Sequence, residues 1–165
     1  MHRQRTSPQL IFRLIFTCCI VLPGASAFSS TVATPVAEAC ALLKAADLKP
    51  LFGRKPVAKG NESSCLWTAS GSKKNLTVVT YKKIVGAPTD IGFESALRSA
   101  VKRGQVNNEH GLGDKAFASI EPSGVTLVIL KQGRLLQLQY RTEAAGTTKD
   151  IEALRPLAKK ALVAY

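Results

Sequence analysis

The sequence predicts an α+β fold, in which a mainly antiparallel sheet is covered by helices. Segments with apolar residues at helical spacing alternate with runs of short segments that are rich in β-branched residues or alternate between apolar and polar residues. Their order is one helix, three strands, a second helix, three strands and a third helix. Runs of strands separated by single helices are typical of α+β proteins. The length of 165 residues corresponds to one domain with a short tail.

The first 27 residues have the pattern of a secretory signal. Basic residues without any acid precede an apolar run over residues 14–22, and the tripeptide ASA follows. This pattern predicts cleavage between Ala27 and Phe28. The apolar stretch 10–22 contains Arg13 and is shorter than the roughly 20 residues needed to cross a membrane, so an uncleaved anchor is the less favoured alternative.

The cysteines indicate an exported protein with one disulfide. None of Cys18, Cys19 and Cys40 stands in the context that a lipoprotein signal requires, so lipid anchoring is not expected. We therefore expect a secreted or periplasmic protein that is not transmembrane after cleavage. Cleavage leaves Cys40 and Cys65, which should pair in an oxidising compartment. No metal site is expected, because the remaining chain has no C-x-x-C motif and only one histidine.

The first half of the mature chain should begin with a helix. Residues 28–34 form a short polar leader, and a single domain is expected over 35–165. Thr34 and Pro35 are typical of a helix start, which predicts a helix over about 35–45. A second helical turn should follow and end at Gly53. This turn is expected over 46–52. The next three strands are expected over 56–59, 64–69 and 76–85.

The second half is expected to repeat this layout. Thr89 should cap a helix over about 90–103, with Phe93, Leu97 and Val101 on its apolar stripe. The polar, glycine-containing segment 107–114 indicates an exposed turn. Three strands are then expected over 116–121, 125–131 and 134–141.

The last part of the chain indicates which strand lies at the centre. The stretch 125–130 is apolar on both faces, which predicts a central strand with cover on both sides, whereas 134–141 alternates and should have one wet face. A final helix should begin near Thr148. Pro156 lies inside it and is expected to bend or interrupt it.

No catalytic residue or cofactor is expected from the motifs. His110 is the only histidine of the mature chain, and no G-x-S-x-G sequence accompanies it. The G-x-G-x-x-A stretch that starts at Gly111 precedes a strand instead of opening a helix, which excludes a dinucleotide fingerprint. His110, Gly111, Gly113 and Asp114 are instead candidates for a binding loop, with a plain surface turn as the alternative.

Basic charge is the unusual bulk property. The formal net charge is +12 and falls to +9 when the first 27 residues, with three arginines and no acid, are removed. Such a charge suits an anionic envelope component or an acidic protein, or serves only solubility. Nucleic acid is not expected as a partner, because few aromatic residues interleave with the basic ones. The candidate basic patch comprises Arg54, Lys55, Lys73, Lys74, Lys82 and Lys83.

Several short motifs together resemble a known group of proteins. Cys40-x-Leu42-Leu43, Cys65-x-Trp67 and Gly111-Leu112-Gly113-Asp114-x-Ala116-Phe117 are similar to a pattern in secreted bacterial proteins of unknown function, many of them actinobacterial lipoproteins. The pattern also resembles extracellular sensor domains of mycobacterial receptor kinases. The resemblance implies a PsbP-like α/β/α sandwich with a Cys40–Cys65 bridge, and it implies no catalytic residues.

The sequence therefore predicts an exported, non-enzymatic binding or sensor-like protein of the cell envelope. Its ligand is expected to be a small apolar molecule between sheet and helix, or an anionic partner on a basic face. A periplasmic inhibitor or immunity-type protein that binds another protein is the first alternative, and 104–115 is the candidate for its protruding loop. A small hydrolase is the second.

Overall fold

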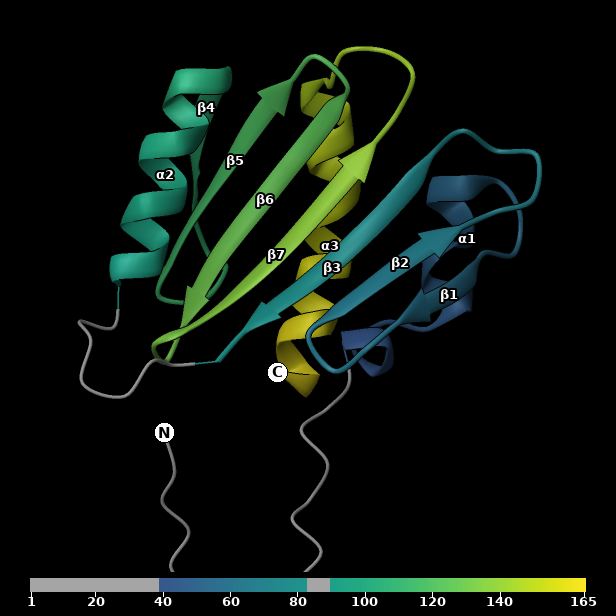
Figure 1. The fold of residues 1–165 in the computed structure, drawn as a ribbon, viewed down its shortest axis with the longest axis horizontal. Coiled ribbons are helices and arrows are strands. Elements are labelled where there is room, and N and C mark those ends of the chain that lie inside the picture. Colours follow the sequence, from purple (N-terminus) through teal and green to yellow (C-terminus); the bar gives the residue numbers. More distant parts are fainter. Residues whose placement is uncertain (1–38, 83–89) are drawn as a thin grey trace, which may run out of the picture. The chain divides into compact units, whose positions relative to one another are not determined.

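The computed structural model of the chain describes residues 39–82 and 90–165. Within them, strands form one antiparallel seven-stranded sheet in the order β1-β2-β3-β7-β6-β5-β4 (Figure 1). The strands are β1 (Val57–Gly60), β2 (Ser64–Thr68), β3 (Asn75–Tyr81), β4 (Gln105–Glu109), β5 (Lys115–Glu121), β6 (Gly124–Lys131) and β7 (Arg134–Arg141). The helices are α1 (Ala45–Phe52), α2 (Ile91–Arg103) and α3 (Thr148–Ala164), preceded by a 3-10 turn, η1 (Ala39–Leu42). The expected α+β class with a mainly antiparallel sheet is confirmed.

Helices lie on both faces of the sheet but cover them unequally. In Figure 1, α3 passes behind the sheet, and the same face carries η1 and α1. The opposite face carries α2 alone, which packs on β4, β5 and β6. We call this the α2 face. Its remaining part, over β7, β3 and β2, has no described helix on it.

The two faces carry separate groups of buried side chains. The larger core lies between the sheet and α3, η1 and α1, and its members from α3 recur at helical spacing: Ile151, Leu154, Leu157, Ala158, Ala161 and Leu162. The smaller one joins α2 to the sheet through Phe93, Ala100, Phe117, Val128 and Leu130. Within it the Phe93 and Phe117 rings meet edge to face, with centroids 5.3 Å apart.

Strands β6 and β7 follow the expected pattern. Residues Gly124–Leu130 of β6 are all buried, because α3 lies on one face of this strand and α2 on the other. In β7, Leu136, Leu138 and Tyr140 enter the larger core, so the residues between them point to the α2 face. The turn between the two strands has positive φ at Gln132 and Gly133, as a two-residue hairpin of type I′ requires.

Several expected elements differ from those observed. The described part of the expected helix 35–45 is only the 3-10 turn η1, whereas the short helix before Gly53 is present as α1, with Gly53 in the left-handed conformation. β3 ends at Tyr81, short of the expected 85, and residues 83–85 and Thr89 lie outside the described residues. In α2, Val101 is 62% exposed, because the buried stripe runs through Phe93 and Ala100, with Ala96 and Leu97 partly buried beside them.

The second half contains four strands where three were expected. Gln105–Glu109, which overlaps the turn expected over 107–114, forms the edge strand β4 and pairs with β5. Glu109 of β4 is buried, and Arg155 of α3 compensates its charge by donating two hydrogen bonds to the carboxylate, from Nε at 2.7 Å and Nη2 at 3.1 Å. The order of elements is therefore helix, three strands, helix, four strands, helix.

The last helix is continuous. α3 runs from Thr148 to Ala164 with Pro156 inside it, so the expected interruption at the proline does not occur. Thr147 accepts a hydrogen bond from the backbone N–H of Asp150, and the Asp150 carboxylate accepts one from the backbone N–H of Thr147. This capping box and the core contacts on both sides of Pro156 hold the helix together.

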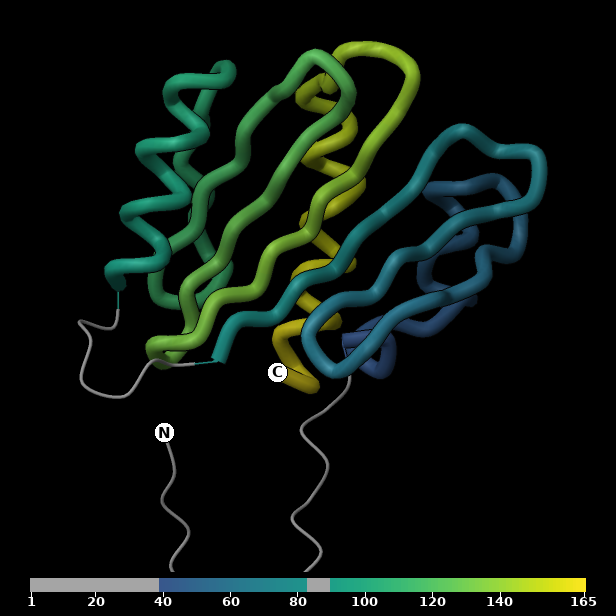
Figure 2. Tube along the Cα trace, viewed as in Figure 1, coloured from purple at the N-terminus to yellow at the C-terminus, as the bar shows by residue number. Residues whose placement is uncertain are grey.

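The expected disulfide is present. Cys40 of η1 and Cys65 of β2 are bonded, with a Cα–Cα distance of 4.9 Å. Cys65 pairs across the strands with Gly60 of β1, so the bridge attaches η1 to the first hairpin of the sheet. The trace in Figure 2 shows how β3 then lies beside β7, which joins the two halves of the chain in one sheet.

Candidate functional site

A cavity of the described residues lies between α1 and α3. Its volume is about 450 Å³, and it adjoins the part of the sheet that carries Tyr140. This volume is within the range of small-molecule sites. Its walls are partly apolar and carry charged groups of both signs; among its residues are Pro50, Leu51, Tyr140, Ala153, Pro156 and Leu157. We call it the α1–α3 pocket.

An ion pair closes one wall of the α1–α3 pocket. Nζ of Lys160 on α3 lies 2.6 Å from the Asp47 carboxylate on α1. The hydrogen bond from Lys160, followed by one from the backbone N–H of Lys44, holds the pKa of the Asp47 carboxyl below its usual value. Asp47 therefore stays ionised and ties the two helices together.

Tyr140 and Asp150 supply the polar groups on another side of the pocket. Tyr140 is almost fully buried, and burial, followed by the nearby Asp150 carboxylate, raises the pKa of its hydroxyl. The hydroxyl therefore keeps its proton and can donate a hydrogen bond. Lys74, from the turn before β3, places an ammonium at the same pocket. These groups can bind and orient a ligand, and they include no nucleophile paired with a general base.

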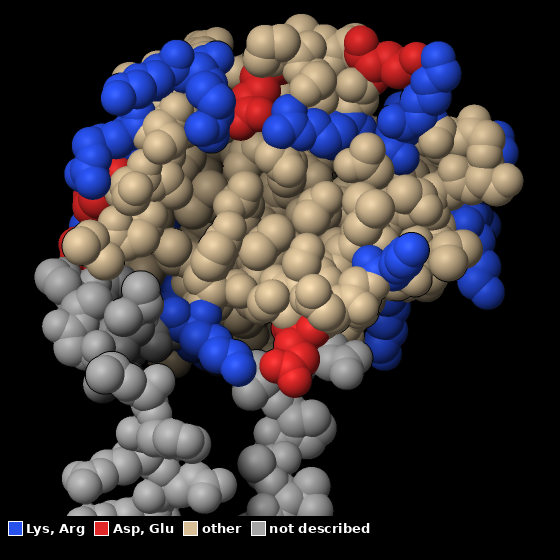
Figure 3. Space-filling model, viewed as in Figure 1, with Lys and Arg blue, Asp and Glu red and all other residues tan. Residues whose placement is uncertain are grey.

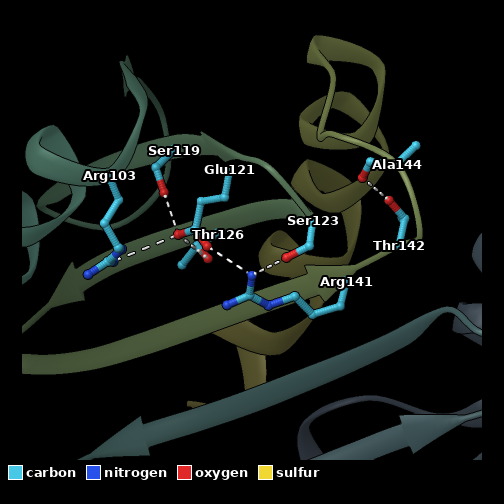
Figure 4. A network of polar contacts seen from close by, with 8 residues as sticks. All are labelled: Arg103, Ser119, Glu121, Ser123, Thr126, Arg141, Thr142 and Ala144. Carbon is cyan, nitrogen blue, oxygen red and sulfur yellow. Dashed lines mark hydrogen bonds and ion pairs between the residues drawn. The ribbon is translucent and has the colours of Figure 1, made fainter.

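A second candidate site lies on the α2 face, around a buried carboxylate. Glu121, only 6% exposed, stands at the end of β5. Figure 4 shows Ser119 and Thr126 pointing to it; their hydroxyls each donate a hydrogen bond to Oε1 at 3.2 Å. Nη1 of Arg141 lies 3.1 Å from Oε2, and Nη2 of Arg103 lies 3.7 Å from Oε1.

The Glu121 cluster joins the end of α2 to three successive strands of the sheet. Arg103 ends α2, Arg141 ends β7, and the hydroxyl groups come from β5 and β6. Beside the cluster, a cavity of about 180 Å³ separates α2 from the sheet. It is lined in part by Ser99, Arg103, Ser119, Thr126 and Gln137. Sequence reasoning missed this cluster, because nothing in the spacing of these residues marks them as neighbours.

The expected binding loop is a tight turn between β4 and β5. Gly111 and Gly113 have positive φ there, and the Asp114 carboxylate accepts a hydrogen bond of 2.6 Å from the backbone N–H of Gln132. Leu112, in the same turn, is 2% exposed and belongs to the larger core. The His110 side chain is exposed and makes no hydrogen bond within the part of the chain that is described. Leu112 and Asp114 therefore attach the turn to the fold, while His110, Gly111, Gly113 and Asp114 are exposed at its surface.

The residues of the candidate basic patch do not gather at one place. Arg54 donates a hydrogen bond of 2.7 Å to the carbonyl of Ser70, which brings it to the turn that contains Lys73 and Lys74. Lys82 follows the opposite end of β3 and lies 3.9 Å from Glu62. Lys55 lies next to Arg54 in the chain and is exposed, and Lys73 is paired with Glu143. Lys83, like Ala27 and Phe28 at the expected cleavage point, lies outside the described residues.

Residues 39–82 and 90–165 contain no group of three or more His, Cys, Asp or Glu side chains placed to hold a metal ion. None of their helices combines the length and hydropathy needed to cross a membrane. Comparison of the chain with protein-family models, curated proteins and solved structures finds no match.

Proposed function

We propose that the protein is an exported, non-enzymatic binding module of the cell envelope that holds a small molecule in the α1–α3 pocket. The observation that carries this proposal is the pocket itself, a cavity of about 450 Å³ in which apolar walls meet a few polar groups. It lies between α1 and α3 and reaches the sheet at Tyr140, so a ligand in it would contact both helices and the sheet.

The lining suggests the chemistry of the ligand. Pro50, Leu51 and Leu157 offer an apolar surface, and Asp47 is already engaged with Lys160. The Tyr140 hydroxyl and the Lys74 ammonium remain for a ligand, whereas the Asp150 carboxylate already accepts hydrogen bonds from Thr147. A compact, largely apolar molecule with one polar or charged end fits this distribution, because its body can leave water while its end is hydrogen-bonded.

Export is part of the proposal and rests on the N-terminal sequence pattern together with the disulfide. The basic start, the apolar run and the ASA tripeptide support secretion or transfer to a periplasm. The Cys40–Cys65 bridge is compatible with an oxidising compartment. The helices on both faces of an antiparallel sheet support the PsbP-like sandwich that the motif resemblance implies. The four strands between α2 and α3 differ from the three that were expected there.

The proposal is tested by ligand capture and by blocking the pocket. The full chain is produced with its own N-terminal segment, recovered from the extracytoplasmic fraction and examined by native mass spectrometry and thermal shift with a small-molecule library. Ala153 is exposed and lines the pocket, so Ala153→Trp should fill it with an indole ring. Glu152→Trp places the same ring next to it on α3, where it does not line the pocket.

We expect a ligand that raises the melting temperature of the wild type and of Glu152→Trp but not of Ala153→Trp. Equal shifts in both variants would place the ligand elsewhere and reject the pocket. The absence of both a captured ligand and any shift would reject small-molecule binding. In that case the alternative of a protein-binding inhibitor becomes the leading function.

A further inference from the structure

The open part of the α2 face is a second surface to which the proposed function gives no role. α2 packs on β4, β5 and β6, whereas β7, β3 and β2 have no described helix on this face. Figure 3 looks onto this side of the sheet: its centre is largely uncharged, and Lys and Arg side chains stand around its edge. We call this surface the open face.

Amide and hydroxyl groups occupy the middle of the open face. Gln137 and Gln139 of β7 point to it, because the alternate residues of this strand enter the larger core. The strand register places Gln139 between Thr77 of β3 and Thr126 of β6. Both glutamines are half-buried, and neither side chain makes a hydrogen bond within residues 39–82 and 90–165. The open face thus offers fixed donors and acceptors that the described fold does not use.

Positive charge gathers at one end of the open face. Arg141 continues the row of Gln137 and Gln139 along β7, and Arg103 stands opposite it at the end of α2. Both guanidinium groups face a single carboxylate, that of Glu121, which Arg103 approaches only to 3.7 Å. Each guanidinium has five N–H donors, so both retain donors for a second anionic group.

The other end of the open face carries a small aromatic and apolar area. Tyr81 is 48% exposed and pairs across the strands with Leu135. Leu66 of β2, 38% exposed, does not belong to this end, because it lies in the row of Thr77 and Gln139. A protein interface would have an aromatic and apolar centre with a polar rim. Here the amide and hydroxyl groups stand in the middle. Single-stranded nucleic acid would need a series of stacking rings, and Tyr81 is the one exposed aromatic among the described strand residues of this face.

We propose that the open face binds an acidic carbohydrate chain. Its sugar hydroxyls would exchange hydrogen bonds with the Gln137 and Gln139 amides and with Thr77, and an acidic group would lie between Arg103 and Arg141. Tyr81 offers its ring to the apolar side of a sugar. Charge complementarity supports this occupant, because the mature chain has a net charge of +9 and the arginine pair exceeds its carboxylate by one charge.

The experiment measures binding of an oligogalacturonate by calorimetry, with its methyl ester as the uncharged counterpart. The full chain, recovered as above, should bind the acid at least tenfold more tightly than the ester. Added salt should reduce this difference in affinity, because it screens the charges. Gln139→Ala should lower the affinity for both ligands at least fivefold, because it removes an amide that contacts both of them. Arg103→Ala should lower the affinity for the acid only. Arg98→Ala serves as the matched control, because Arg98 is an exposed arginine of α2 that does not line the cavity.

Further probes distinguish this site from a general anion surface. Inorganic phosphate, polyglutamate and single-stranded DNA are titrated under the same conditions, and we expect weaker binding of all three, with no effect of Gln139→Ala. Equal or tighter binding of polyglutamate or DNA would overturn the proposal, as would equal losses in Arg98→Ala and Arg103→Ala. Circular dichroism and the melting temperature verify that each variant is folded. Ala153→Trp should leave carbohydrate binding unchanged, which separates the open face from the α1–α3 pocket.

Discussion

Reduction of the Cys40–Cys65 disulfide should lower the free energy of unfolding substantially. The two residues are 25 positions apart in the sequence, so the bond closes a medium-sized loop in the unfolded chain. The closure entropy of such a loop corresponds to about 3.5 kcal/mol at 25 °C. Reduction leaves both sulfur atoms in place, so it removes the cross-link without opening a cavity. For a domain of this size the loss corresponds to a fall of about 10 °C in the melting temperature.

The assay compares thermal unfolding of the protein with and without a thiol reductant, followed by circular dichroism. The double variant Cys40→Ala/Cys65→Ala is the control, because the reductant should leave its melting temperature unchanged. Its melting temperature should lie at or below that of the reduced wild type, since Cys65 is fully buried and loses packing when truncated. The single variant Cys40→Ser should show a loss of similar size.

One result would refute this reasoning. If the wild type melts at the same temperature in both conditions, while mass spectrometry shows that reduction is complete, the bridge does not restrict the unfolded state as argued. The stabilisation would then have to come from contacts that survive reduction, such as the pairing of Cys65 with Gly60.

Three further substitutions test other parts of the structure. The pKa of Asp47 in the folded protein lies below its reference value of 3.8, so the Asp47–Lys160 pair stabilises the fold above that pH and is lost as the pH falls through the folded pKa. Asp47→Asn should therefore flatten the decline of stability in acid, measured by urea denaturation below pH 4, and an unchanged pH profile would contradict the assignment. Gly60→Ala should destabilise the fold by about 1–3 kcal/mol, because its Cβ would lie 2.2 Å from the Ser64 carbonyl oxygen; a variant with wild-type stability to urea would contradict the close approach of β1 to β2. Val101→Lys should change the free energy of unfolding by no more than about 0.5 kcal/mol, since this side chain is mostly in solvent. A large fall in the melting temperature would show that Val101 is buried in the core.

Local sequence patterns were enough to predict most of the sheet and the last helix. Residues 136–141 of β7 alternate between apolar and polar, and Ile151, Leu154 and Leu162 recur at helical spacing, so periodicity alone locates these elements. β4 was missed because its composition, QVNNE, is that of a turn. An edge strand is defined by its neighbour, in this case the backbone of β5, and not by its own side chains. The exposure of Val101 likewise depends on how α2 is rotated over the sheet.

The candidate sites could not be predicted from the sequence, for a related reason. Each is assembled from residues of distant elements: the Glu121 cluster needs Arg103 and Arg141 on either side of it, and the α1–α3 pocket needs Asp47 beside Lys160. The disulfide was the exception, because removal of the expected signal would leave two cysteines, and each then has only one partner. His110 was a candidate for a binding loop as the one histidine after the expected signal. In the structure it is exposed on its turn and has no hydrogen-bond partner among the described residues.

The strand order has a consequence for how the protein reaches its folded state. β1, β2 and β3 form one meander and β4 to β7 another, and each can form from nearby residues. The seam between them, β3 against β7, is central to the sheet but joins segments far apart along the chain. Closing that seam brings together segments that are distant along the chain and carries a large loop-closure entropy, so we expect it to be the slow step of folding. Substitutions that weaken the β3–β7 ladder should therefore delay refolding more than substitutions at the outer strands, and any kinetic trap should consist of two formed meanders that have not yet met.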